Sequence, residues 1–352
     1  MQRSGIFVIL GARRQVTEDQ QKVRVGVYGG AGYAGLDLVE ILAKHPHVEI
    51  IFATSDTYAG QSVIGTNLHY IPFAQADMDA VDAVFLALPH KASAPVAAKA
   101  VTKGLKVLDL SADLRLNTPE AYEKWYGTPH PNPELLPVPY GLPEINRAII
   151  AKSSLIAVPG CYPTTTILGL YPLLCSGAIE PGTPVIVDAK SGVSGAGREP
   201  KANTHFVEVF GNFSPYSPGR SHRHVGEIEQ EITKIDPNLG TLIFTPHLLP
   251  VDRGLMASIY VTLKVDFDSA DMQALYEQTY DHEPLVNVLP PKEQATLRHV
   301  VRTNTCAISL TPVTPRYLHI TSVTDNLRKG ASGQAVQDFN LICGFDETTA
   351  LL

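Results

Sequence analysis

The chain has 352 residues, of which 44% are hydrophobic and 18% are charged, so enough apolar surface exists to offset the chain entropy of folding and disorder is excluded. Its 28 Lys and Arg against 35 Asp and Glu leave a net charge of −7, which argues against a nucleic-acid partner. No stretch approaches the roughly 18 consecutive apolar residues of a membrane helix, and at about 150 residues per domain the length predicts two domains.

Residues 1–22 contain one short apolar run, 5–10, followed by Arg13 and Arg14. This run is shorter than the core of a signal peptide, and no small-residue cleavage site is obvious after it. We interpret the segment as an extension or a start-site artefact, with a transit segment as the alternative. The four scattered cysteines form no C-x-x-C pair, so we expect no metal site and a reducing, cytoplasmic location.

The first half of the chain alternates strand-like and helix-like patterns. β-branched or apolar runs at 23–28, 48–53, 83–88 and 107–110 predict strands, and an alanine-rich stretch, 92–101, predicts a helix between the last two. Alternation of this kind predicts a parallel sheet with helices on both faces, that is, an α/β fold.

The pattern changes after residue 160. A helix is predicted from Thr164 to Cys175, because Pro163 can open it and Gly177 can close it. Alternating runs rich in Val, Ile, Thr and Tyr follow and predict a second sheet, mostly antiparallel or mixed, while the last segment is helical again: 184–189, 241–245, 256–265, 317–323 and 327–344.

A glycine-rich turn joins the first strand to the first helix. Its residues match G-x-G-x-x-G in the strand-to-helix context that this dinucleotide-binding motif requires. Glycines let the backbone approach a pyrophosphate, and the helix N-terminus offers unpaired N–H groups to it. A tight turn without a ligand is the alternative, and we favour a Rossmann dinucleotide site with these cofactor-binding candidates: Gly29, Gly30, Gly32, Tyr33, Ala34 and Gly35.

One cysteine stands in a sharp turn just before the predicted helix of the second half. Cys161 lies between Pro159-Gly160 and Tyr162-Pro163, which argues for an exposed turn. A helix N-terminus stabilises a thiolate, so we expect a lowered pKa and a nucleophilic sulfur. The alternative is a buried structural cysteine, and this is our interpretation of Cys175, Cys306 and Cys343.

A nucleophilic thiol needs a group that handles its proton. The best candidates are His222 and His224, in the run Ser-His-Arg-His-x-x-Glu that ends at Glu227. Histidines two residues apart cannot face the same way on a helix, so at most one points at Cys161. The residues alone leave open which of the two it is. Metal binding is the rival interpretation, but no carboxylate or thiol stands four residues further on to complete a site.

Arg115 follows the strand run 107–110, at the end of a parallel strand where ligands of open α/β sheets collect. Its guanidinium suits a phosphate or a carboxylate. The alternative is an ordinary ion pair with Asp109 or Asp113.

Eight segments, in this order, resemble the N-acetyl-gamma-glutamyl-phosphate reductase family of the aspartate-semialdehyde dehydrogenase-like group. The resemblance runs from about residue 23 to 344. The segments read Gly32-Tyr-Ala-Gly35, Ala87-Leu-Pro-His90, Ser111-Ala-Asp-Leu-Arg115, Tyr140-Gly-Leu-Pro-Glu144, Pro159-Gly-Cys-Tyr-Pro-Thr164, Ser194-Gly-Ala-Gly-Arg198, His222-Arg-His224 and Asp325-Asn-Leu-x-Lys-Gly330.

The resemblance implies a Rossmann domain, 23–160, completed by a C-terminal helix, 327–352, and an α+β catalytic and oligomerisation domain with a mixed sheet, 161–326. It implies an NADPH-dependent enzyme of arginine biosynthesis that reduces an acyl phosphate through a cysteine thioester, assembled as a homodimer or homotetramer. The roles it implies are nucleophile for Cys161, acid/base for His224, phosphoryl or substrate binding for Arg115, His222 and Glu144, and nicotinamide contacts for Ser191, Gly192 and Asn326.

Three alternatives remain within this resemblance: an aspartate-semialdehyde dehydrogenase, an aminoadipyl-phosphate reductase and a non-catalytic dinucleotide-binding protein. The Tyr162-Pro163 pair after the cysteine favours the arginine branch over the aminoadipate branch, in which Asn-Ala tends to follow. For the cofactor, Thr54 and Ser55 can donate hydroxyl bonds to a 2′-phosphate, whereas Asp56 repels it if its carboxylate points inward. We expect NADPH, with Asp56 turned outward toward the 57–60 loop.

Overall fold

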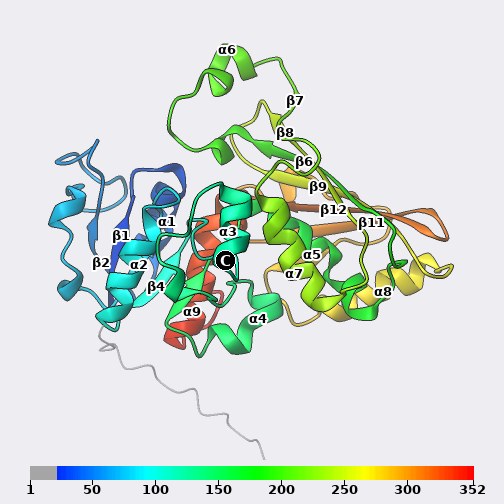
Figure 1. Ribbon diagram of the computed structural model, residues 1–352, viewed down its shortest axis with the longest axis horizontal. Coiled ribbons are helices and arrows are strands. Elements are labelled where there is room, and N and C mark those ends of the chain that lie inside the picture. Colours follow the sequence, from blue (N-terminus) through cyan, green and yellow to red (C-terminus); the bar gives the residue numbers. More distant parts are fainter. Residues whose placement is uncertain (1–21) are drawn as a thin grey trace, which may run out of the picture.

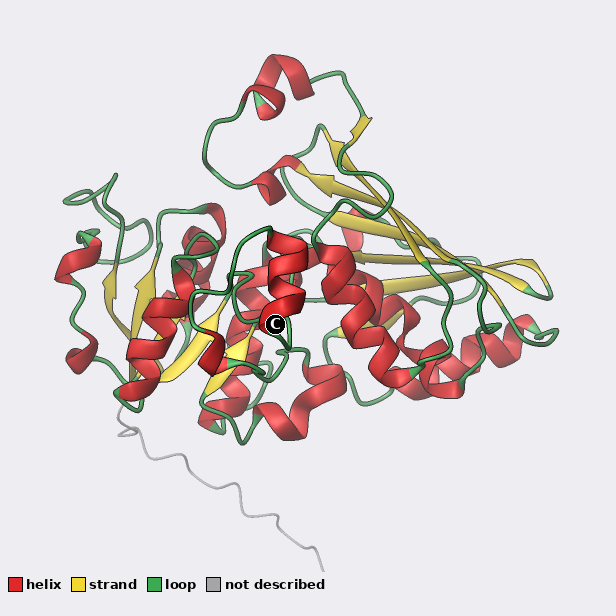
Figure 2. Cartoon of the chain, viewed as in Figure 1, coloured by secondary structure: helices red, strands yellow, loops and turns green. Residues whose placement is uncertain are grey.

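The computed structural model describes residues 22–352 (Figures 1 and 2). The interpretation of the N-terminal segment concerns residues outside this range, apart from Lys22. Within the described part of the chain, no helix has both the length and the apolar character needed to cross a membrane.

The first sheet is parallel, as predicted, and has five strands. Its order is β2-β1-β3-β4-β5, with the strands Val23–Tyr28 (β1), Val48–Ala53 (β2), Ala83–Leu86 (β3), Lys106–Asp109 (β4) and Leu155–Ala157 (β5). The sequence pattern missed β5, which has only three residues. The connecting helices are Tyr33–Lys44 (α1), Ser93–Thr102 (α2), Pro119–Tyr126 (α3) and Pro143–Ile150 (α4).

The second sheet is mixed and seven-stranded, with the order β10-β11-β12-β9-β6-β8-β7. Its β6/β8 and β10/β11 pairs are parallel and the others antiparallel, which confirms the predicted mixed sheet. The strands are Val185–Gly192 (β6), Ser214–Pro215 (β7), Leu242–Leu249 (β8), Leu255–Thr262 (β9), Val286–Val288 (β10), Cys306–Thr314 (β11) and Tyr317–Thr324 (β12).

Three helices cover one face of this sheet and share its apolar core: Cys161–Ser176 (α5), His224–Ile235 (α7) and Ser269–Tyr280 (α8). A long segment between β6 and β7 carries the short helix α6 (Phe206–Val209) and projects away from the rest of the molecule (Figure 1). Single 3-10 turns lie at Phe73–Gln75, Met78–Ala80, Pro133–Leu135, Val193–Ala196, Ala202–Thr204 and Leu297–His299.

The C-terminal helix returns to the first sheet. A π-helical turn, Arg328–Ser332, leads into α9 (Gly333–Cys343). Val336 and Phe339 of α9 belong to the same core as Val25, Leu38 and Phe85 of the first sheet and its helix. The N-terminal and C-terminal parts of the chain therefore build one hydrophobic core, while the domain boundary at residue 160 stays a prediction.

Helix α5 begins three residues before the predicted start. Gly160 is its extended N-cap residue, with φ −71° and ψ 154°, so Cys161 is the first helical residue. Pro163 lies within the first turn, where a missing N–H removes no helical hydrogen bond. Gly177, with φ +61°, ends the helix as expected.

Candidate active site

The glycine turn leaves space for a ligand at the N-terminus of α1. Gly29 has φ +76°, and a Cβ atom at Gly35 would lie 2.2 Å from the carbonyl oxygen of Gly29, so the helix packs directly on the turn. A Cβ at Gly32, the N-cap residue, would have only that same oxygen nearby, at 3.6 Å. This open cradle of backbone N–H groups fits a pyrophosphate.

The residues after β2 hold this turn. Thr54 is 2% exposed, and its Oγ1 accepts a 3.0 Å hydrogen bond from the Gly29 N–H. Ser55 Oγ accepts from the backbone N–H of Tyr58. The Asp56 carboxylate accepts a hydrogen bond from the Phe73 N–H at 2.8 Å. The expected contact of this carboxylate was with the 57–60 loop instead. The chain returns beside the end of β2 at Ile71, and this return places the Phe73 N–H within reach of Asp56.

Two cavities adjoin each other beside this turn. One of about 510 Å³ is lined by Tyr33 and Leu36 of α1, by parts of the 193–205 segment, and by Arg253 and Leu327. The other, of about 280 Å³, is lined by Cys161, Ser191, Gly192, His222 and His224, among others. Lys201 and Thr204 line both cavities. The geometry thus brings a candidate cofactor space and the candidate thiol to neighbouring positions.

Cys161 is partly buried, and burial raises the pKa of its thiol to about 11, although the nearby Arg115 cation works in the opposite direction. The expected lowering of this pKa is therefore wrong for the free protein. The reason is that loss of solvation outweighs the helix N-terminus and the arginine together. A thiol of this kind needs a base before it can act as a nucleophile.

Glu227 organises the site and was not assigned a role from the sequence. Its side chain is 1% exposed; its Oε1 accepts 2.8 Å hydrogen bonds from the Gly160 N–H and the Tyr140 hydroxyl, and its Oε2 lies 3.4 Å from Arg115 Nη1. The signal was present as the His224-x-x-Glu227 spacing, since residues three apart share one face of a helix.

Arg115 is 8% exposed and is held by backbone carbonyls. Its Nε donates to the Val158 oxygen and its Nη2 to the Leu110 oxygen, both at 2.8 Å. The alternative of an ion pair with Asp109 or Asp113 is wrong. Those carboxylates instead accept bonds from backbone N–H groups and hydroxyls around the start of α2, after β4 and in α3: Lys91, Ser93, Ala94, Ser111 and Tyr122.

His224 and His222 both lie beside Cys161, in different ways. A Cβ at Gly160 would be 2.7 Å from His224 Nε2, so this nitrogen faces the turn that carries the cysteine. The His222 Nδ1 accepts from the His224 backbone N–H, and its ring packs against Tyr162, Tyr216 and Phe244. Burial lowers the pKa of His222 to about 4 and that of His224 well below its ordinary value. Both imidazoles are therefore neutral at pH 7.

Gly160 is the residue on which this arrangement depends most closely. A Cβ there would lie 2.7 Å from His224 Nε2 and 2.9 Å from Arg115 Nη1. We expect Gly160→Ala to lower kcat about 100-fold by moving these groups apart, since displacements of about 1 Å have effects of that size. Steady-state kinetics test this, with Gly182→Asn as the control for a glycine distant from the site, because Gly182 lies in an open turn with φ +72° that asparagine tolerates. Unchanged kcat in Gly160→Ala would contradict the geometry.

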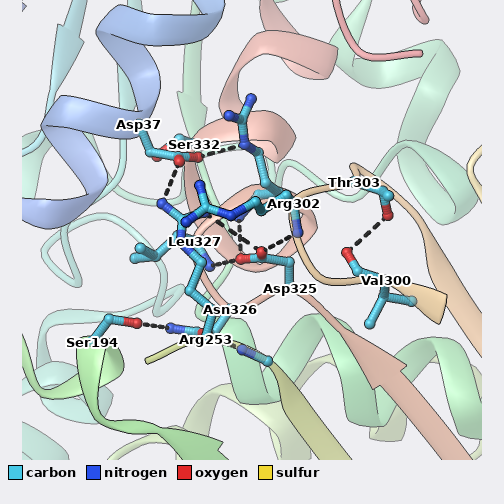
Figure 3. A network of polar contacts seen from close by, with 12 residues as sticks. Asp37, Ser194, Arg253, Val300, Arg302, Thr303, Asp325, Asn326, Leu327 and Ser332 are labelled. Atoms are coloured by element: carbon cyan, nitrogen blue, oxygen red, sulfur yellow. Dashed lines mark hydrogen bonds and ion pairs between the residues drawn. The ribbon is translucent and has the colours of Figure 1, made fainter. Parts of the chain in front are cut away.

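The nicotinamide candidates lie at the ends of two strands of the second sheet, β6 and β12. Ser191 and Gly192 line the cavity of Cys161. Asn326 is buried; its Oδ1 accepts from the Gly254 N–H at 2.8 Å and its Nδ2 donates to Ser194 Oγ at 2.9 Å (Figure 3). Asn326 therefore fixes the loop that follows Ser191, and a direct cofactor contact stays a prediction.

An ionic network beside Asn326 ties the glycine-turn helix to the second sheet (Figure 3). Asp37 of α1 pairs with Arg253 at 2.6 Å and with Arg328 at 2.9 Å. Arg253 also lies 3.5 Å from the Asp325 carboxylate, which in turn accepts from the Arg302 N–H. These contacts hold the two walls of the larger cavity in one arrangement.

Glu144 does not line the cavity of Cys161, although the resemblance implied a role for it in substrate binding. Its side chain is fully buried and forms an ion pair with Lys329 at 2.5 Å. The side chain turns inward because Lys329, in the turn before α9, supplies a buried cation that needs an anion.

Comparison with known proteins places the chain in a family. Models described as "Semialdehyde dehydrogenase, NAD binding domain" and "Semialdehyde dehydrogenase, dimerisation domain" match residues 24–153 and 161–326. N-acetyl-gamma-glutamyl-phosphate reductases from Moorella thermoacetica and Desulforudis audaxviator are 45% and 44% identical, each over 94% of this chain and 98% of the relative. The chain belongs to the N-acetyl-gamma-glutamyl-phosphate reductase family.

Solved structures share the fold of this reductase family member. Aspartate semialdehyde dehydrogenase II from Vibrio cholerae superposes with a TM-score of 0.74 at 20% sequence identity, over 92% of this chain and 99% of that one. The Candida albicans aspartate semialdehyde dehydrogenase with NADP gives a TM-score of 0.68 at 14% identity, over 92% and 99% of the two chains. These likenesses confirm the two-sheet fold.

Proposed function

We propose that the protein reduces N-acetyl-L-glutamyl 5-phosphate to N-acetyl-L-glutamate 5-semialdehyde, with NADPH as reductant and phosphate as the leaving group. The observation that carries this proposal is the convergence of His224 and Arg115 on Gly160, the residue before Cys161, in a cavity adjoining that of the glycine turn. The names of the curated relatives support the same substrate.

The first half-reaction uses only groups of this chain. The neutral His224 imidazole accepts the Cys161 proton, and the sulfur attacks the acyl carbon. The C–O bond to the phosphoryl group then breaks, and phosphate leaves beside the Arg115 guanidinium, which suits its oxygens. The product is a thioester on Cys161, and covalent catalysis of this kind divides one difficult substitution into easier steps.

The nicotinamide, when bound, supplies the hydride for the second half-reaction. His224, protonated in the first half, gives its proton to the oxygen of the reduced thioester carbon. It takes a proton back from that oxygen as the C–S bond breaks, which releases the aldehyde and returns the thiolate. Glu227 holds Arg115 and the Gly160 N–H in place through these steps.

The residues present fit a dinucleotide. The backbone of Gly29, Gly30 and Gly32 and the first turn of α1 would hold the pyrophosphate. Ser55 would lie by the adenosine ribose at the end of β2, and Thr54 would fix the turn. Ser191, Gly192 and Asn326 would border the nicotinamide.

Rates with three acyl phosphates test the substrate. We expect the kcat/KM for N-acetylglutamyl phosphate to exceed those for aspartyl and aminoadipyl phosphates at least about 100-fold. Site groups that bind the N-acetyl amide are left unpaired by the free amine of aspartyl phosphate, and the longer aminoadipyl chain displaces the acyl carbon from the thiol. The reverse reaction, from each aldehyde with phosphate and NADP⁺, provides a second reading. A faster rate with either rival would replace the proposal, and dinucleotide binding without turnover of any would favour a non-catalytic protein.

We also propose a homodimer or homotetramer in a reducing compartment such as the cytoplasm. Ile186, Ile243 and Tyr260 are about 40% exposed on paired strands of the sheet face opposite the helices, an apolar patch suited to association. All four cysteines are free thiols, as a reducing compartment favours. Light scattering at micromolar concentration is expected to give at least twice the chain mass; a monomer would contradict the proposal.

A further inference from the structure

Arg198 connects the second half of the chain to the glycine turn. It follows β6 and directly follows Gly197, whose φ of +86° turns the chain at this point. Its Nη1 donates a 2.7 Å hydrogen bond to the carbonyl oxygen of Ala31, and its guanidinium carbon lies 4.4 Å from the centre of the Tyr58 ring. A residue 167 positions away in sequence thus lies across the proposed dinucleotide site.

The two groups that Arg198 contacts identify the end of the site at which it lies. Ala31 belongs to the glycine turn, which faces the pyrophosphate. Tyr58 belongs to the turn after β2, because its N–H donates to Ser55 Oγ. In this type of fold the 2′ substituent of the adenosine ribose is recognised at the end of the second strand. Arg198 therefore lies between the pyrophosphate and the 2′ position.

The charges around this position favour an anion. Two carboxylates lie near Arg198 and Tyr58 along the chain: Glu199, which lines the larger cavity together with Arg198 and Lys201, and Asp56, whose Oδ1 accepts from the Phe73 N–H. Within residues 22–352 Arg198 forms no ion pair, and the bond to Ala31 uses only one of its five N–H groups. Stacking on Tyr58 holds the guanidinium plane and leaves its edge free for hydrogen bonds.

We propose that Arg198 binds the 2′-phosphate of NADPH and so sets the preference over NADH. The proposal rests on the proposed function for the identity of the cofactor and deepens it by naming the residue that reads the phosphate. It also explains how a chain with Asp56 after its two hydroxyl residues accommodates a phosphate: the cation comes from the segment after β6 rather than from the end of β2.

Calorimetric titration of NADP⁺ and NAD⁺, without acyl substrate, tests this in the full-length protein. These ligands differ only in the 2′-phosphate. We expect Arg198→Ala to weaken NADP⁺ binding about 10- to 100-fold, the loss typical of charge-assisted hydrogen bonds, and to leave NAD⁺ within about twofold. Arg198→Lys keeps the charge without the planar fork, so an intermediate loss is expected.

Arg316→Ala is the matched control, because Arg316 is an exposed arginine paired with Glu180 on the second sheet. It should leave both dissociation constants unchanged. Equal weakening of NADP⁺ and NAD⁺ in both Arg198 variants would assign Arg198 a structural role, and unchanged NADP⁺ binding would also overturn the proposal. Failure of the proposed function looks different: NADP⁺ discrimination would persist while no acyl phosphate is reduced.

Discussion

Replacing Cys161 by serine is expected to lower kcat/KM on the order of 10⁴-fold or more, the size of effect seen when a covalent nucleophile is removed. The serine hydroxyl is a far weaker nucleophile than a thiolate, and its oxygen ester would be a poorer acceptor of hydride than a thioester. The measurement is NADPH oxidation with N-acetylglutamyl phosphate.

Cys175→Ser is the matched control for this prediction. Cys175 is an exposed free thiol in the last turn of the same helix, α5, although its sequence neighbours had indicated a buried position. Its replacement should leave the rate within about twofold. NADP⁺ binding should survive in both variants, because neither cysteine lies in the glycine turn. Near-normal turnover in Cys161→Ser would exclude the thioester route.

His224→Asn is expected to cause the second largest loss, about 10²- to 10⁴-fold in kcat, the usual contribution of general acid–base catalysis. The cause is the thiol itself: burial raises the pKa of Cys161 to about 11, so near neutral pH the thiolate forms only if a neighbour takes the proton. With asparagine in place of His224, kcat should rise with pH as hydroxide replaces the missing base. The pH profile of kcat for both proteins tests this.

His222→Asn separates the two histidines, a choice that the sequence left open. His222 is wedged among aromatic rings and accepts from the His224 N–H, so asparagine there should reduce kcat about tenfold or less through altered positioning of His224. A larger loss in His222→Asn than in His224→Asn would reverse the assignment.

Structural features that depend only on residues adjacent in the sequence could be predicted. The strand, glycine turn and helix at 23–44 follow from local pattern, and so does the turn before α5, since glycine and proline restrict the backbone there. The parallel and the mixed sheet were both predicted correctly. Four strands were missed: β5, β7 and β10, which have only two or three residues each and show no periodicity, and β11, Cys306–Thr314.

The partners of the site residues could not be predicted, because they come from distant parts of the chain. Arg115 pairs with Glu227, 112 residues away, and Glu144 pairs with Lys329, 185 residues away. The predicted lowering of the Cys161 pKa was wrong for the same reason. The sequence neighbours of Cys161 indicate a helix N-terminus, whereas the burial of its thiol depends on how the two halves of the chain pack together.

Mass spectrometry of the protein after incubation with N-acetylglutamyl phosphate, in the absence of any nicotinamide cofactor, tests the central claim most directly. Without a hydride donor the reaction should stop at the thioester, so the chain should gain the mass of one N-acetylglutamyl group on the peptide that contains Cys161. Addition of NADPH should remove this mass and release aldehyde. An unmodified Cys161 peptide, with aldehyde still formed in the complete reaction, would contradict the covalent mechanism.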